Sequence, residues 1–130
     1  MGEKEEIDKI TGAIIGAAIK VHRELGPGLL ESAYEACTMY ELIEDGWKVE
    51  HQKPIPLVYR GVSLDCGYRL DLLVAEKVVT EIKAVDRLLP IHRAQLLSYL
   101  KISGHKVGLL INFNVRVLKD GVVRLINGYF

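Results

Sequence analysis

Two acidic residues and a lysine stand in short apolar segments near the middle of the chain. Asp71 interrupts the apolar run 70–74, and Glu81 and Lys83 flank Ile82 shortly afterwards. Because side chains alternate along a strand, Glu81 and Lys83 are expected to share one face. Carboxylate oxygens are the ligands that Mg²⁺ prefers, and a bound Mg²⁺ or Mn²⁺ beside a lysine can activate water. The residue types therefore predict a divalent-cation site beside a lysine.

The two apolar runs predict a β-hairpin over residues 68–83 with its turn at Glu76-Lys77. Neighbouring strands would place Asp71 about 5 Å from Glu81. Two carboxylates at that separation repel each other unless positive charge lies between them. The alternative interpretation is that these charges lie on the solvated face of an antiparallel hairpin.

A polar stripe follows on a helix predicted over residues 91–102. His92, Gln95 and Tyr99 fall at i, i+3 and i+7, within a sector of about 60°. One interpretation is a solvated helix rim with a snorkelling tyrosine. The other is that Gln95 and Tyr99 reach the carboxylate site while His92 contacts a phosphate or the leaving group. Packing is assigned to the opposite side, which holds Leu96, Leu97 and Leu100.

Two amphipathic helices are predicted ahead of the hairpin. Apolar residues recur at spacings of three and four over residues 5–25, and Gly26-Pro27-Gly28 ends that helix. The second helix runs over residues 30–44, with its buried surface assigned to Leu30, Ala33, Tyr34, Cys37, Tyr40 and Leu42. Glu31 lies in its first turn, where its carboxylate would interact favourably with the positive helix end.

The remaining segments predict strands. Residues 47–51 alternate as a short strand, and Pro54 and Pro56 restrict the segment around them to an edge or an extended crossing. Residues 55–66 predict a hairpin turning at Arg60-Gly61, and residues 107–112 a strand covered on both sides. Residues 115–126 predict a terminal hairpin turning at Asp120-Gly121. The order of elements indicates one α/β domain with a mixed sheet.

Composition limits the classes of function. The 130 residues carry no net charge, which argues against a general nucleic-acid binder. Residues 1–50 hold 5 Lys and Arg against 11 Asp and Glu, whereas residues 84–130 hold 7 against 2. That late basic surplus suits a phosphate-facing surface and consists of Arg87, Arg93, Lys101, Lys106, Arg116, Lys119 and Arg124.

No segment predicts a signal peptide or a membrane span, so a cytoplasmic protein is expected. Cys37 and Cys66 lie far apart without metal-ligand spacing and are expected to be partly buried free thiols.

Asp71, Glu81-Ile82-Lys83 and then Gln95-x-x-x-Tyr99 together resemble the PD-(D/E)xK nuclease-like superfamily. Gly28-Leu-Leu-Glu31-Ser-Ala-Tyr34 resembles the GxxExxY family, a branch of that superfamily. The likeness extends from about Ile14 to Asn114. It departs from the superfamily's name at one position, because Leu70 rather than proline precedes Asp71.

The resemblance implies a restriction-endonuclease-like core over residues 1–130, with a central mixed β-sheet flanked by helices. It makes Asp71 and Glu81 metal ligands, aided by the backbone carbonyl of Ile82. Lys83 would orient or deprotonate the attacking water or stabilise developing charge, with Glu31 and Gln95 as further catalytic candidates. The candidates for substrate contact are Arg69, His92, Tyr99 and Lys101.

Three functions are compatible with the sequence. The first is a Mg²⁺- or Mn²⁺-dependent nuclease acting on DNA, favoured over RNA. The second is a catalytically silent module that binds nucleic acid or a protein partner on a nuclease-like scaffold. The third is a structural or dimerising protein that pairs through apolar edges near residues 107–111 and the terminal hairpin. A homodimer or a larger protein partner would help so small and neutral a domain to grip a duplex.

Overall fold

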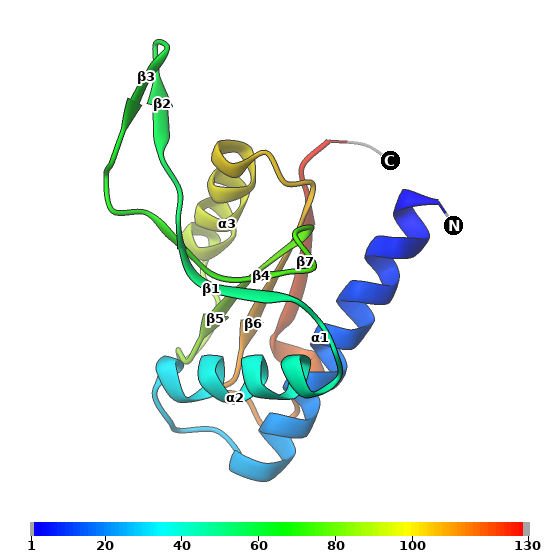
Figure 1. The fold of residues 1–130 in the computed structure, drawn as a ribbon. Helices are drawn as coiled ribbons and strands as arrows, with labels where there is room; N and C mark the ends of the chain where they lie inside the picture. Colours follow the sequence, from blue (N-terminus) through cyan, green and yellow to red (C-terminus); the bar gives the residue numbers. More distant parts are fainter. Residues whose placement is uncertain (1, 129–130) are drawn as a thin grey trace.

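The computed structural model describes residues 2–128, so Met1, Tyr129 and Phe130 of the predicted domain lie outside the described residues. Three helices, seven strands and one short 3₁₀ helix make up the described part of the chain (Figure 1). In chain order they are α1 (Glu3–Leu25), α2 (Glu31–Glu44), β1 (Val49–Pro54), β2 (Leu57–Tyr59), β3 (Val62–Leu64), β4 (Arg69–Val74), β5 (Val78–Lys83), α3 (Pro90–Ser103), β6 (Val107–Asn112), η1 (Leu118–Gly121) and β7 (Val122–Ile126).

The central sheet has five strands in the order β1-β4-β5-β6-β7. Only β5 and β6 run parallel, in a register from Val78↔Val107 to Lys83↔Asn112, and α3 makes the crossover between them. The β1–β4, β4–β5 and β6–β7 pairs are antiparallel. This mixed sheet flanked by helices confirms the predicted restriction-endonuclease-like fold class.

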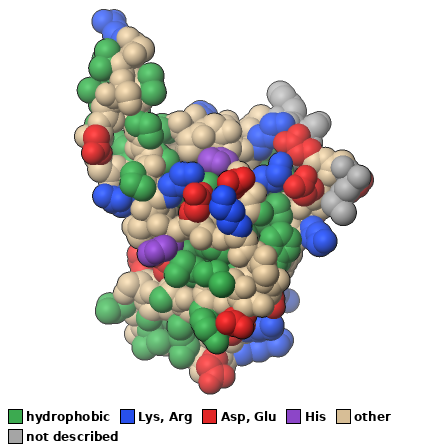
Figure 2. Space-filling model, viewed as in Figure 1, with side chains coloured by type: hydrophobic (Ala, Val, Ile, Leu, Met, Phe, Trp, Pro, Cys, Tyr) green, Lys and Arg blue, Asp and Glu red, His purple; other side chains and the backbone are tan. Residues whose placement is uncertain are grey.

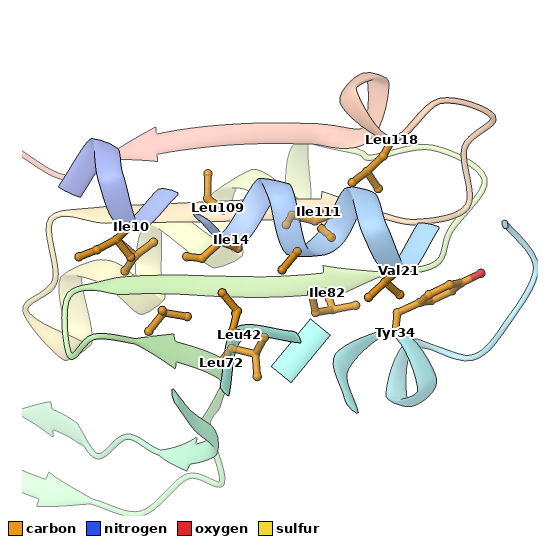
Figure 3. Packing of buried hydrophobic residues seen from close by; sticks show 14 of the residues in the cluster. Ile10, Ile14, Val21, Tyr34, Leu42, Leu72, Ile82, Leu109, Ile111 and Leu118 are labelled. Carbon is orange, nitrogen blue, oxygen red and sulfur yellow. The ribbon is translucent and has the colours of Figure 1, made fainter. Parts of the chain in front are cut away.

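Helices cover both faces of the sheet. The packing of α1 and α2 against one face is shown in Figure 3, where Ile14 of α1 and Leu42 of α2 lie over the strand residues Leu72, Ile82 and Leu109. On the other face α3 packs through Leu96 and Leu100 against a second cluster that includes Leu73, Val79 and Leu110. Alternation along β5 therefore directs Glu81 and Lys83 to the α3 side, the side of Val79.

The buried stripe of α2 differs from the prediction. Tyr34, Thr38 and Leu42 are fully buried, whereas Leu30 is 77% exposed and Tyr40 is 62% exposed. The buried residues repeat every four positions, so a single narrow row of the helix contacts the sheet. The prediction was wrong for Leu30 and Tyr40 because it assigned burial by residue type rather than by that row.

Strands β2 and β3 form a hairpin that stands away from the body of the molecule (Figure 1). The structure confirms this hairpin and its turn, where Arg60 has a positive φ of 52°. Its strands make a separate two-stranded sheet, and Figure 2 shows hydrophobic side chains along this arm. Val58, Tyr59 and Val62 are each more than half exposed.

The predicted terminal hairpin is wrong. Residues 118–121 form η1, and β7 pairs with β6 rather than with residues 115–119. Leu118 is 3% exposed and anchors η1 in the core beside α1. Gly121 permits the tight turn into β7, since a Cβ built there would lie 2.2 Å from the Asn112 backbone oxygen.

The dimerisation edge predicted near residues 107–111 is also absent from the described residues. Strand β6 lies between β5 and β7, and every one of its residues is buried. Its continuous apolar run reflects coverage on both faces, and its backbone is already paired on both sides.

Two further observations concern the chain as a whole. Cys37 and Cys66 are free, as predicted, but Cys66 is exposed because it lies in the link after the arm. Among residues 2–128, no helix combines the length and the apolar character needed to cross a bilayer.

Candidate functional site at the splayed end of β4 and β5

Asp71 and Glu81 lie side by side where β4 and β5 separate. The β4–β5 register extends only to Leu72↔Thr80, one residue short of them. Beyond that point carboxylates replace the ladder: the Asp71 N–H donates to Glu81 Oε2 at 2.9 Å, and the Ile82 N–H donates to Asp71 Oδ2 at 2.8 Å. Each carboxylate is thus held by the backbone of the opposite strand, and the solvated-face interpretation does not describe this pair.

Burial dominates the electrostatics of the pair. Glu81 is 5% exposed, and desolvation followed by the charge of Asp71 raises its pKa to about 8. Desolvation also raises the pKa of Asp71, while the Ile82 N–H, Gln52 and the Lys83 charge oppose that shift. Because burial raises both pKa values, the surrounding protein does not fully stabilise two negative charges at this site.

Gln52 and Glu35 also belong to this cluster, and the sequence interpretation missed both. Gln52 Nε2 lies 2.9 and 3.0 Å from the two Glu35 oxygens and 3.3 Å from Asp71 Oδ1, so one amide serves two carboxylates. Gln52 has a positive φ of 47°, and the β1–β4 register skips it together with Asp71. Burial, and then the Asp71 charge, raise the pKa of Glu35.

A signal for Glu35 was present in the sequence, because Glu35 follows Glu31 by one helical turn and shares its face. Gln52 carried no such signal. Its position depends on a left-handed residue within β1, which no turn motif indicates.

Glu31 reaches the end of β5. Its Oε2 accepts a hydrogen bond from the Ala84 N–H at 3.1 Å, directly after Lys83. The Lys83 carbonyl in turn accepts a hydrogen bond from the Phe113 N–H at 2.8 Å. The first turn of α2 and the loop after β6 therefore both attach to the strand end that carries Lys83.

Tyr34 fixes the loop that presents Glu31. Its hydroxyl donates to the Gly26 carbonyl at 2.5 Å and accepts from the Leu29 N–H at 3.0 Å. Its ring stacks on Phe113 with centroids 4.5 Å apart. The Gly-x-x-Glu-x-x-Tyr segment thus combines a site carboxylate with the tyrosine that sets the loop before it.

The polar stripe of α3 divides between the site and other roles. Burial, and then the Glu81 charge, raise the pKa of Tyr99, while a hydrogen bond from the Gln95 side chain opposes the shift. His92 Nδ1 accepts a hydrogen bond from the Leu89 N–H at 2.9 Å and caps the start of α3, so a substrate contact by His92 would have to use its other ring nitrogen. Lys101 is exposed near the end of α3. Arg69 Nη1 donates to the Gln52 carbonyl at 3.4 Å.

The donor set at this end of the sheet suits a hard divalent cation. Asp71 and Glu81 offer only oxygen ligands, and a bound cation would offset the burial that raises their pKa values. Among residues 2–128, no three His, Cys, Asp or Glu side chains are grouped so as to hold a metal. An ion here would complete its coordination with backbone oxygen, water or substrate.

A model of the PD-(D/E)XK nuclease superfamily matches residues 8–125. The chain belongs to this superfamily, and its scaffold is nuclease-like. No curated protein and no solved structure matched the chain.

Proposed function

We propose that this protein is a metal-dependent nuclease that hydrolyses phosphodiester bonds in nucleic acid, with DNA favoured over RNA. The observation that carries the proposal is the buried Asp71–Glu81 pair beside Lys83 at the splayed end of β4 and β5. Superfamily membership makes nucleic acid the expected substrate.

The site residues have distinct roles in this proposal. Mg²⁺ or Mn²⁺ bound by Asp71, Glu81 and the Ile82 carbonyl would supply Lewis acidity toward the phosphate. Lys83 orients or deprotonates the attacking water, and its charge lowers the pKa of both carboxylates. Glu31 and Gln95 complete the catalytic group, and the substrate contacts fall to Arg69, His92, Tyr99 and Lys101.

Three finer predictions accompany the proposal. The chain belongs to the GxxExxY branch, a prediction carried by Gly28, Glu31 and Tyr34. Residues 1–130 act as a single nuclease-like domain. The protein works in the cytoplasm, as a homodimer or with a larger protein partner where the substrate requires it.

Cleavage assays test the proposal directly. Purified protein is incubated with single- and double-stranded DNA and RNA in the presence of Mg²⁺ or Mn²⁺. Cleavage is expected, and Asp71→Ala or Lys83→Ala should lower the rate by about 10²–10⁴-fold. Lys77→Ala is the matched control, because Lys77 lies at the other end of the β4–β5 hairpin. Absence of cleavage for every form and both metals rejects the nuclease proposal.

The second candidate is a catalytically silent module that binds nucleic acid or a protein partner. It is favoured by Gln52, whose amide hydrogen-bonds both Glu35 and Asp71 and so stabilises part of their charge. Melting temperatures with and without Mn²⁺, for wild type and Asp71→Asn, separate the two candidates. A rise that occurs only in the wild-type protein supports the metal site, whereas no rise in either protein supports the silent module.

A further inference from the structure

A small pocket lies between the start of β4 and the exposed side of α3. It has a volume of about 290 Å³ and is lined by Tyr68, Ile91, Ala94, Gln95, Ser98, Tyr99 and Ile102. The lining contains no Asp, Glu, Lys, Arg or His. Two of the residues are aromatic, one is an amide and most of the others are aliphatic, so the lining suits a flat, neutral group rather than a phosphate.

The pocket adjoins the carboxylate pair. Tyr99 lines it, and the charges of Glu81 and Asp71 both act on the Tyr99 hydroxyl. Tyr68 lies three residues before Asp71, and its carbonyl accepts a hydrogen bond from the Ile55 N–H at 3.0 Å. A strand whose phosphate sits at Asp71 and Glu81 therefore passes close to the pocket.

The exposed surface of the pocket is aromatic and apolar. The Tyr68 and Tyr99 rings have centroids 5.8 Å apart and are tilted by 58°, so neither ring is stacked flat on the other. Tyr68 is 38% exposed and Ile91 is 66% exposed. A flat ring that covered this surface would remove apolar area from water, which is favourable. The Gln95 side chain also lines the pocket, and its amide could hydrogen-bond the edge of such a ring.

We propose that this pocket binds an unpaired nucleobase next to the scissile phosphate, which makes single-stranded nucleic acid the preferred substrate. The inference rests on the proposed nuclease function and deepens it. A base inside a duplex has both faces stacked and reaches such a pocket only after extrusion from the stack, which is unfavourable. A chain with no net charge gains less from phosphates than a basic one does, so stacking of the base adds to the binding.

Binding is measured by fluorescence anisotropy with the protein that keeps Asp71, in Ca²⁺ in place of Mg²⁺ or Mn²⁺ so that no strand is cleaved. The probes are one labelled single-stranded DNA, the same sequence as RNA, the same sequence as a duplex, and an abasic strand of equal length. The DNA strand is expected to bind more tightly than the duplex and the abasic strand. Tyr68→Ala should weaken single-strand binding by about 5- to 150-fold, the equivalent of about 1–3 kcal/mol for one stacked base.

Matched variants separate stacking from loss of structure. Tyr68→Phe keeps the ring and should bind like the parent protein. Tyr40→Ala removes another exposed tyrosine, which lies on α2 at 62% exposure, and should have no effect. A melting curve for Tyr68→Ala confirms that the variant remains folded, and Ile91→Ala provides a second change in the pocket lining.

Three outcomes overturn the inference: equal affinity for the duplex and the single strand, equal affinity for the abasic strand, or a Tyr68→Ala variant that binds as well as Tyr40→Ala. Failure of the nuclease proposal has a different signature. In that case the wild-type protein binds single strands through Tyr68 but cleaves nothing with Mg²⁺ or Mn²⁺.

Discussion

Gln52 combines a strained backbone with a bridging side chain. Its φ of 47° lies in the left-handed region, which costs a non-glycine residue about 1–2 kcal/mol. Its amide lies between Glu35 and Asp71 and holds both carboxylates. The hydrogen bonds of the side chain to both carboxylates offset this strain, and such strain is often found at functional sites.

A pair of substitutions separates the two properties. Gln52→Gly and Gln52→Ala both remove the amide, but only glycine accepts the positive φ without strain. We expect Gln52→Gly to be more stable than Gln52→Ala by about 1 kcal/mol in urea unfolding. Equal stability of the two variants would show that the backbone at this position relaxes freely.

Glu81 makes the stability of the metal-free protein depend on pH. Its pKa is raised from 4.5 to about 8, so the folded protein holds a proton that the unfolded chain has already lost between those values. The free energy of unfolding therefore falls as pH rises from about 4.5 to about 8. Urea unfolding in chelator at several pH values measures this decrease.

Glu81→Gln should flatten that pH dependence, because the amide carries no titrating proton. The matched control is Glu76→Gln, since Glu76 lies at the exposed hairpin turn. If the free energy of unfolding fell equally with pH in Glu81→Gln and in the wild-type protein, Glu81 would not be the source of the pH dependence.

At the scale of elements, the turn from β6 to β7 depends on one glycine. A Cβ at Gly121 would lie 2.2 Å from the Asn112 backbone oxygen, and backbone atoms cannot move aside as a flexible side chain does. Gly121→Ala is expected to destabilise the protein by at least about 1–3 kcal/mol. Thermal or urea unfolding measures this loss.

Gly12→Ala is the matched control for that change. Gly12 lies within α1, where an added Cβ meets no atom within 4 Å. Alanine is the better helix former, so this variant should gain about 0.4–1 kcal/mol. If both variants lost stability equally, the close approach at Gly121 would not be the cause.

The helices and most strands were predictable because each follows a local rule. The spacing of Ile7, Ile10 and Ile14 indicates α1, and Gly104 ends α3 in the left-handed conformation. The β6–β7 connection was not predictable in this way. Asp120-Gly121 is a strong turn signal, but the burial of Leu118 draws the preceding residues into η1, and that contact is made only in the folded protein.

Some residues of the candidate site were also predictable from local patterns, and others were not. Asp71, Glu81 and Lys83 stand out because each is a charge in an apolar strand, and Glu31 because of its motif. Gln52 and the neutral pocket at Tyr68 depend on which strands lie side by side and on where β4 and β5 separate. A one-residue shift of β1 against β4 would remove Gln52 from Asp71, so long-range register decides these contacts.

At the scale of the whole molecule, charge is distributed unevenly. Among residues 2–128, ion pairs gather around the start of α1, where Glu3, Glu6 and Asp8 bind cations from other elements or from α1 itself. At the opposite end, Lys83, Arg116 and Lys119 form no ion pair with described residues within 4 Å. These three side chains are therefore available to contact phosphates, beside a site that itself holds the carboxylates of Glu31, Asp71 and Glu81.

This distribution predicts a shallow salt dependence of nucleic-acid binding. Contacts to about three or four phosphates of a single strand correspond to a slope of about −2 to −3 in a plot of log K against log salt. Anisotropy titrations at several salt concentrations measure that slope. A slope near −6 or steeper would instead indicate a wide phosphate clamp, as formed by an oligomer.

The β2–β3 arm is expected to open locally while the rest of the protein stays folded. Its strands are three residues long, and none of its residues belongs to either core cluster. An isolated two-stranded ribbon is marginally stable in water, so the amide hydrogens of the arm should exchange with solvent by local opening. The amide hydrogens of β5 and β6 should exchange only when the whole protein unfolds. A fluorophore or a short insertion at the Arg60-Gly61 turn should consequently perturb the five-stranded sheet and its helices least. Slower hydrogen exchange at this turn would show that a bound partner contacts the arm.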